Sequence, residues 1–138
     1  SLISNFWRCP DLLQFGPEPV NNFGIGGDKI ENVLWRLQNG EVSKHSQLVI
    51  IHVGTNNAQH DSPSKIIRGF RALCEAVRDT APFASVCLGT ILPRCCSPDI
   101  SQKILEINGM LKECVPFWAS ELAMMRCHGP TLRVISVL

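Results

Sequence analysis

Residues 47–57, QLVIIHVGTNN, decide the fold of this chain. A continuous apolar and β-branched run, Gln47–Val53, is followed at once by a polar turn. Such a run is typical of a parallel strand that is buried on both of its faces, whereas a half-exposed strand alternates apolar and polar residues. The stretch therefore predicts an inner strand of a parallel sheet, with a loop at its carboxyl end.

On both sides of this strand the chain alternates between helical and extended patterns. An apolar stripe at i, i+3, i+4 and i+7 predicts helices, and short apolar runs between turn residues predict strands. The expected helices are Lys29–Gln38, Ser62–Ala81 and Asp99–Val115, and the further strands are Val20–Ile25, Ala84–Leu92 and Leu132–Leu138. This alternation predicts an α/β fold with a three-layer, doubly wound parallel sheet in a single domain, residues 1–138.

Capping and helix-breaking residues indicate where the expected helices begin and end. Asn39-Gly40 is a natural stop for the first helix, and Ser62-Pro63 supplies the N-cap and the first-turn proline of the second. Pro116 should end or kink the third helix, because proline removes a backbone donor and clashes with the preceding turn.

Composition excludes several classes of protein. The 138 residues carry a formal net charge of +1 with no basic run, which gives no support to nucleic-acid binding. No apolar stretch approaches the roughly 20 residues that a membrane-spanning helix needs. Seven cysteines without regular spacing and without CxxC argue against a disulfide framework and a metal site, and favour free, buried thiols in a reducing compartment.

Two glycine- and asparagine-rich segments follow predicted strands, at the sheet edge where open parallel sheets bind ligands. They are FGIGGD, Phe23–Asp28, and GTNN, Gly54–Asn57. The first lacks the GxGxxG spacing of a dinucleotide loop. A glycine N–H and an asparagine amide at neighbouring strand ends are the components of an oxyanion hole. The alternative is that both segments are ordinary turns, in which glycine and asparagine are common.

Four blocks in order carry a specific resemblance: Asn21–Glu41 (NNFGIGGDKIENVLWRLQNGE), Val49–Asn57 (VIIHVGTNN), Leu88–Arg94 (LGTILPR) and Glu106–Lys112 (EINGMLK). They resemble the SGNH (GDSL-like) hydrolase superfamily, and within it the catalytic α subunits of intracellular type I platelet-activating-factor acetylhydrolase. The resemblance implies a flavodoxin-like fold, a serine esterase acting on short acyl esters without metal or cofactor, and a cytoplasmic location. It fades over residues 116–138.

The resemblance also implies roles for individual residues. Ser1 would be the nucleophile, because its spacing to the FGIGG loop is close to that of the superfamily, although it could also be an arbitrary first residue. Gly27 and Asn56 would be oxyanion donors beside the Ser1 backbone N–H. Leu2 and Thr55 would contact the substrate, and the acyl pocket would be lined by Thr55. Asn57 stands where many members have Asp.

One expected element is missing from the sequence. No Asp has a His three residues later, so the DxxH base of the superfamily is absent, and none of the four histidines is expected to replace it: His45, His52, His60 and His128. We therefore expect a fragment truncated at both ends, with Gly-Asp before Ser1 and Asp-x-x-His beyond Leu138.

Rival hypotheses stay open at this point. The chain could be a catalytically inactive SGNH-fold subunit for binding or assembly, or a decayed fragment. The acetylhydrolase α subunits pair with one another and with a β-propeller regulatory protein, so the resemblance implies such partners as well as an ester substrate. An N-terminal-nucleophile hydrolase would need a four-layer architecture, which the βαβ order disfavours.

Overall fold

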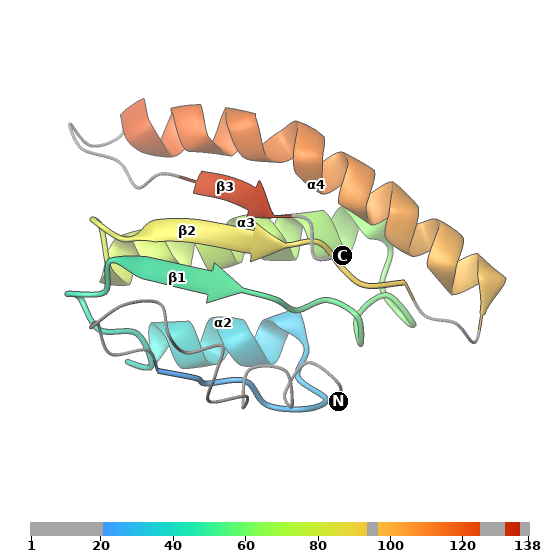
Figure 1. The fold of residues 1–138 in the computed structure, drawn as a ribbon, viewed down its shortest axis with the longest axis horizontal. Helices are drawn as coiled ribbons and strands as arrows, with labels where there is room; N and C mark the ends of the chain where they lie inside the picture. Colours follow the sequence, from blue (N-terminus) through green and yellow to red (C-terminus); the bar gives the residue numbers. More distant parts are fainter. Residues whose placement is uncertain (1–20, 94–96, 125–131, 136–138) are drawn as a thin grey trace.

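The computed structural model describes residues 21–93, 97–124 and 132–135 of the chain, with side chains as far as residue 121. Along the chain these residues form α2 (Ile30–Gln38), β1 (Leu48–Ile51), α3 (Pro63–Thr80), β2 (Ser85–Gly89), α4 (Pro98–Met124) and β3 (Leu132–Ile135) (Figure 1). The strand–helix alternation predicted from sequence is therefore confirmed, and β1 and β2 are three and four residues shorter than expected.

The three strands form one parallel sheet in the order β1-β2-β3. Ile51 pairs with Leu88, and Leu88 pairs with Val134, so the strands run in step and end at the same edge. The crossovers β1-α3-β2 and β2-α4-β3 both step in one direction across the sheet. With the usual right-handed connection, such crossovers place their helices on the same face.

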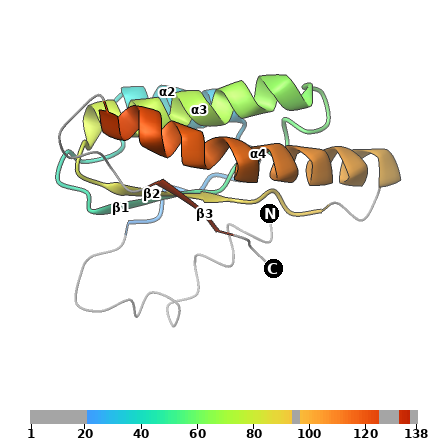
Figure 2. The same cartoon turned by 90° about the horizontal axis from the view of Figure 1, so that it is seen from above.

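All three described helices do lie on one side of the sheet (Figure 2). α3 is in the middle, packed against α2 and against α4. The described residues thus show an α/β arrangement of one helical layer on a parallel sheet. The second helical layer of a doubly wound fold stays a prediction.

The core lies between this helical layer and the sheet. The stripe predicted for α3 is buried along its whole length, and the inward positions of β2 and α4 meet it. Its least exposed large side chains are Ile66, Phe70, Leu73, Val77, Val86, Leu88, Ile91, Ile104, Ile107 and Leu111. Burial of such side chains is the main favourable term in folding.

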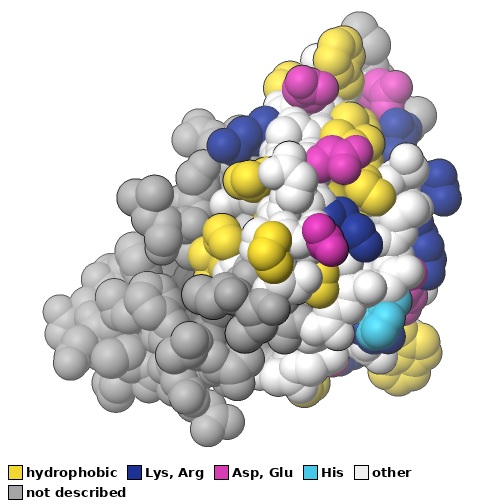
Figure 3. All heavy atoms as spheres, turned by 90° about the vertical axis from the view of Figure 1, so that its right-hand side faces the viewer, with side chains coloured by type: hydrophobic (Ala, Val, Ile, Leu, Met, Phe, Trp, Pro, Cys, Tyr) yellow, Lys and Arg dark blue, Asp and Glu magenta, His cyan; other side chains and the backbone are white. Residues whose placement is uncertain are grey.

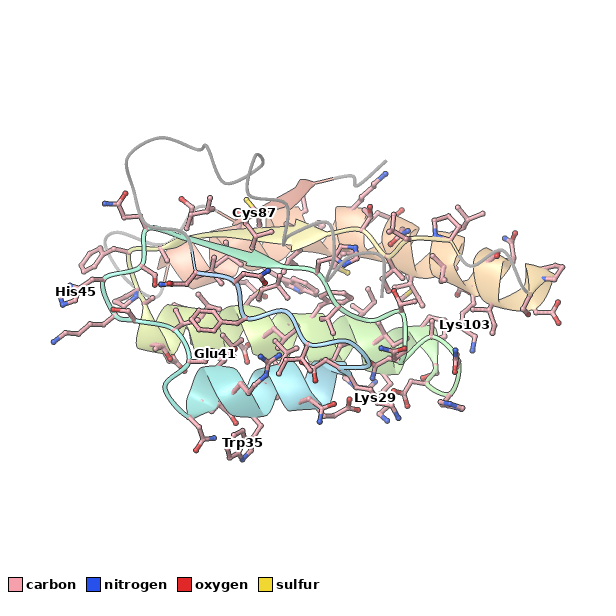
Figure 4. The ribbon with its side chains drawn as sticks, turned by 60° about the horizontal axis from the view of Figure 1, so that its bottom comes forward. Lys29, Trp35, Glu41, His45, Cys87 and Lys103 are labelled. Carbon is pink, nitrogen blue, oxygen red and sulfur yellow. The ribbon has the colours of Figure 1, made fainter. Side chains whose placement is uncertain are left out.

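The opposite face of the sheet is open along β1, which corrects one expectation. Ile51 is buried, but Leu48 and Ile50, which point the other way, are 54% and 43% exposed. Cys87 pairs with Ile50 and lies on the same face, turned away from α3 (Figure 4). The prediction that β1 is buried on both faces is therefore wrong for this chain.

The expected strand Val20–Ile25 is also wrong. Val20 falls outside the described residues, and 21–25 contain no regular structure. Side chains satisfy the backbone here in place of a sheet partner. Asn22 Oδ1 accepts from the Gly24 N–H at 2.9 Å, and Arg36 Nη1 donates to the Phe23 carbonyl at 2.8 Å.

The helix ends follow their sequence signals, with one exception. α2 ends at Gln38 with Gly40 at φ +90°, and Ser62 Oγ accepts from the Lys65 N–H at 3.3 Å to cap α3, as predicted. Pro116, however, does not end α4, which continues to Met124. The buried stripe of α4 extends past the proline through Val115 and Trp118, and this packing holds the helix together there. Trp118 thus packs in the core.

The described cysteines carry free thiols, in agreement with the sequence analysis. Cys74 is buried, whereas Cys87 and Cys114 are half-buried. Burial raises the pKa of the Cys74 thiol to about 12, since the apolar core disfavours the thiolate. Cys9, Cys95, Cys96 and Cys127 lie outside the described residues.

Candidate active site

The candidate site lies at the edge toward which the strands point, at the right of Figure 1. Gly54–Asn57 follows β1 at this edge, as predicted, and Gly24–Gly27 precedes α2. Figure 3 looks onto this edge and shows hydrophobic, acidic and basic side chains interspersed there. The carboxyl edge of a parallel sheet is where α/β proteins usually place their ligands.

A hydrogen bond joins the two loops. Asn56 Nδ2 donates to the Asp28 carbonyl at 2.9 Å, which places Asn56 beside the end of the Gly24–Gly27 loop. Gly27 adopts φ +88° and is exposed, with open space where a Cβ would stand. The structure thus brings Gly27 and Asn56 together, and one of the two Asn56 amide protons is used in the contact.

Arg36 of α2 fixes the glycine loop from the helix side. Its guanidinium donates to the Phe23 carbonyl at 2.8 Å and to the Asp28 carboxylate, so that one side chain contacts both residues that flank Gly24–Gly27. Glu41 Oε1 accepts from the same guanidinium at 2.5 Å. The Arg36 and Asp28 side chains are each only 17% exposed, which protects the pair from solvent screening.

Asn57 fixes the second loop and is the most buried polar residue of the site, at 2% exposure. Its Oδ1 accepts from the Ile30 N–H at 2.9 Å, which caps the amino end of α2 beside the local bond from the Lys29 N–H to Asn32 Oδ1 at 3.0 Å. Its Nδ2 donates to Glu31 Oε2 at 3.0 Å and to Asp61 Oδ2 at 2.8 Å. Two of the three hydrogen bonds of the Asn57 amide, to Ile30 and Glu31, therefore join the loop to α2, and the third, to Asp61, lies within the segment between β1 and α3.

The carboxylates around Asn57 are held ionised. Hydrogen bonds from its own backbone and from Asn57 lower the pKa of Glu31. Hydrogen bonds from Lys65 and then Asn57 lower the pKa of Asp61, and Asp61 in turn raises the pKa of Lys65. Charged acceptors strengthen the hydrogen bonds that they receive. The cluster therefore fixes the loop, and none of its carboxyl groups is tuned toward proton transfer at neutral pH.

Two further contacts fix the base of the Gly54–Asp61 segment. Lys103 Nζ of α4 donates to the Ala58 carbonyl at 3.0 Å, and Lys103 and Lys29 both lie at this end of the molecule (Figure 4). Gly54 adopts φ +112°, and a Cβ there would come within 2.8 Å of Ile91 Cδ1. Only glycine fits this position without strain.

The other predicted site residues are placed as follows. Thr55 is half-buried in the turn after β1. Ser1 and Leu2 lie outside the described residues, so their assigned roles stay predictions. The structure gives the positions of Gly27, Asn56 and Thr55, and their roles at the site are proposals.

The described histidines are placed as follows. His45 lies at the opposite end of the molecule from the two loops (Figure 4), and His60 is an exposed turn residue. His52, just beyond β1, is half-buried and its Nε2 lies 3.2 Å from the Thr90 carbonyl. Burial lowers the pKa of His52. His128 is not among the described residues.

In the part of the chain that is described, no three His, Cys, Asp or Glu side chains are grouped so as to hold a metal ion. Within that part, no helix combines the length and apolar character needed to cross a bilayer.

Sequence reasoning missed the roles of Arg36 and Asn57. In the sequence, Arg36 looks like an ordinary charged residue on the outer face of a helix. Asn57 looks like the second residue of an asparagine pair. Their contacts span 13 and 27 residues of sequence, to Phe23 and Ile30. The one available signal was α2 itself, whose predicted start, Lys29, is not a side-chain cap and so required a partner from elsewhere.

Comparisons with known proteins identify the family of the chain. The model of the GDSL-like Lipase/Acylhydrolase family matches residues 7–121. Platelet-activating factor acetylhydrolase IB subunit alpha1 of Rattus norvegicus is 36% identical over 115 residues, which are 81% of this chain and 49% of the relative. The alpha2 subunit of Homo sapiens is 35% identical over 104 residues, 74% of this chain and 45% of the relative.

A search of solved structures found Est24, a carbohydrate acetylesterase from Sinorhizobium meliloti, with a TM-score of 0.47 and 19% identity over 86% of this chain and 56% of that one. The chain spans about half the length of the curated relatives that it matches. The resemblance noted in the sequence is confirmed: the chain belongs to the GDSL-like lipase/acylhydrolase family.

Proposed function

We propose that this chain is part of a serine esterase that hydrolyses short acyl esters. The observation that carries the proposal is the Asn56–Asp28 hydrogen bond, because it places the asparagine amide beside the Gly27 backbone, where a pair of donors can face one oxygen. Membership of a family of acylhydrolases supports it. Acetyl esters of phospholipid-like alcohols are the proposed substrates, in keeping with the names of the acetylhydrolase relatives.

In the proposed reaction, Ser1 Oγ attacks the ester carbonyl carbon and its proton passes to a histidine base supplied by the Asp-x-x-His segment of the whole protein. The carbonyl oxygen becomes an oxyanion, which the N–H groups of Ser1 and Gly27 and the amide of Asn56 stabilise. The acyl-serine that forms as the alcohol leaves is then hydrolysed by water. Leu2 and Thr55 contact the acyl group.

The same relatives suggest the setting of the whole protein. We extend the proposal to a second helical layer on the open face of the sheet, to a cytoplasmic location, and to pairing with a second α-type subunit or a β-propeller regulatory protein. The apolar side chains Leu48 and Ile50 on that open face, exposed by 54% and 43%, support the additional layer.

A labelling experiment tests the nucleophile. The whole protein is incubated with a fluorophosphonate probe and the modified residue is located by mass spectrometry. We expect the label on Ser1, with no label in Ser1→Ala, and normal labelling in the control Ser64→Ala, which changes an exposed serine of α3. Labelling that persists in Ser1→Ala would remove Ser1 from the mechanism.

The second candidate is a catalytically inactive subunit of the same fold, which a whole protein without a DxxH motif would favour. Such a protein would keep the fold and the loop contacts but would hydrolyse no ester and accept no probe. Failure of both labelling and p-nitrophenyl acetate hydrolysis in a protein that melts cooperatively would support this candidate.

A further inference from the structure

Arg36 makes an unusual contact with the glycine loop. One terminal nitrogen of its guanidinium donates to the Phe23 carbonyl at 2.8 Å and the other binds the Asp28 carboxylate. Phe23 and Asp28 stand immediately before and after Gly24–Gly27. A single side chain therefore closes the base of the loop and sets the separation of its two ends.

The loop itself offers little that would fix its shape. Gly24, Gly26 and Gly27 lack a Cβ, and the one internal backbone bond, from the Asp28 N–H to the Ile25 carbonyl, is long at 3.4 Å. Phe23 and Ile25 are 48% and 57% exposed and add little packing. Glycine-rich backbone samples many conformations, so the conformation of this loop depends on its anchors.

The anchors are themselves fixed. Arg36 projects from α2, its side chain is 17% exposed, and Glu41 Oε1 accepts at 2.5 Å from the same terminal nitrogen that donates to Phe23. On the other side of the loop, Asn56 Nδ2 holds the Asp28 carbonyl. Asp28 thus receives a hydrogen bond from each of two elements, and the Gly27 N–H beside it is held between α2 and the loop after β1.

From this arrangement we propose that Arg36 is a positioning residue, which orients the Gly27 N–H toward the oxyanion without touching the substrate. The inference rests on the proposed esterase function. Donors that are fixed before the reaction stabilise developing charge at no reorganisation cost, so loosening the loop lowers the rate more than it weakens substrate binding. The planar guanidinium fork is required, because a lysine ammonium can contact only one end of the loop at a time.

The test compares Arg36→Lys with a matched control, Arg71→Lys. Arg71 of α3 also bonds two carboxylates, Glu75 at 3.1 Å and Glu121 at 2.8 Å, but lies away from the loop. Two readouts are measured for each: the kinetics of p-nitrophenyl acetate hydrolysis, and the backbone 15N order parameters of Gly24, Gly26 and Gly27.

In Arg36→Lys we expect kcat to fall at least tenfold with KM within twofold, and the glycine order parameters to fall from about 0.85 toward 0.6 or below. Arg71→Lys should change neither. Unchanged order parameters in a folded Arg36→Lys, or a fall in kcat no larger than the folded fraction explains, would overturn the proposal.

The two failures are distinguishable. If the whole wild-type protein hydrolyses no ester, the proposed function fails, and the order parameters alone then decide whether Arg36 fixes the loop. Should Arg36→Lys not fold, Asp28→Asn provides a second variant, because it keeps the Asp28 backbone carbonyl that Asn56 binds and weakens only the contact with Arg36. A rigid loop in Asp28→Asn would likewise overturn the proposal.

Discussion

Replacing Asn57 by Asp tests the account of how the loop after β1 is fixed. Asp retains an oxygen for the Ile30 N–H at 2.9 Å but, when ionised, can donate to neither Glu31 nor Asp61. The substitution also places a third carboxylate in a position that is 2% exposed. We therefore expect a large loss of stability that depends on pH.

The magnitude follows from the two ways in which the chain can respond. Losing two hydrogen bonds costs about 2 kcal/mol at about 1 kcal/mol each. The upper limit applies if residue 57 stays protonated at pH 7. Protonation costs about 1.36 kcal/mol for each pH unit above a reference pKa of about 3.9, or about 4 kcal/mol, and the one lost hydrogen bond adds about 1 kcal/mol. The free energy of unfolding should therefore fall by about 2–5 kcal/mol.

The sign of the pH dependence separates this mechanism from simple loss of packing. The folded-state pKa of the new carboxyl is raised, so its destabilising effect grows as pH rises and shrinks as pH falls. In the wild type the pKa values of Glu31 and Asp61 are lowered, so their contributions are complete above their ordinary values and do not change between pH 5 and pH 7. The deficit of Asn57→Asp should shrink by up to about 2.7 kcal/mol between pH 7 and pH 5.

The assay is urea unfolding followed by circular dichroism at pH 5, 6 and 7, with Asn57→Leu as the control of similar volume. The control loses all three hydrogen bonds but adds no charge, so its deficit should be the same at each pH. An Asn57→Asp deficit that is independent of pH, or smaller than 1 kcal/mol at pH 7, would refute the reasoning. A variant that folds at pH 5 and not at pH 7 would agree with it.

Three further predictions concern the close contact at Gly89, the proline within α4 and the buried thiol of Cys74. A Cβ on Gly89 would lie 2.6 Å from His52 Cδ2, so Gly89→Ala should cost about 1–3 kcal/mol and His52→Ala should recover part of it, as a double-mutant cycle in urea unfolding would show. Pro116 interrupts the hydrogen bonds of α4, so Pro116→Ala should raise the melting temperature; an unchanged or lower value would contradict this. Cys74, whose pKa is about 12, should resist iodoacetamide at pH 8 in the native state and react on unfolding, as mass spectrometry can follow.

The parts of the fold that were predictable from sequence depend on local periodicity. The stripe of α3 through Ile66, Phe70 and Val77 is buried as its spacing indicated, and the cap at Ser62 lies where the Ser-Pro pair placed it. The order of strands and helices followed from the same patterns. Each of these features is determined by residues within a few positions of one another, so sequence reasoning could reach them.

Errors arose where distant contacts override local preference. Asn22–Ile25 looks like the end of a strand, but side-chain oxygens and the Arg36 guanidinium satisfy its backbone. Pro116 normally breaks a helix, yet Val115 and Trp118 on either side of it are buried against the core and keep α4 continuous. β1 is apolar on both faces, but the structure buries only one of them.

In the candidate site too, features determined by nearby residues were predictable and long-range contacts were not. Gly27 and Asn56 could be named from their motifs, and their neighbouring positions at the carboxyl edge followed from the topology. The contact between Asn56 and Asp28 spans 28 residues, and the burial of Asn57 depends on α2, α3 and the intervening loop. No local pattern encodes these contacts, so they required the three-dimensional structure.

The central claim, that the Asn56 amide and the Gly27 N–H stabilise an oxyanion, is tested most directly by the kinetics of Asn56→Ala with p-nitrophenyl acetate. Removing one such donor typically lowers kcat by about 10²–10³-fold. We predict a fall in this range with KM within about threefold and a melting temperature within a few degrees of wild type. A kcat within twofold of wild type in a folded Asn56→Ala would contradict the claim.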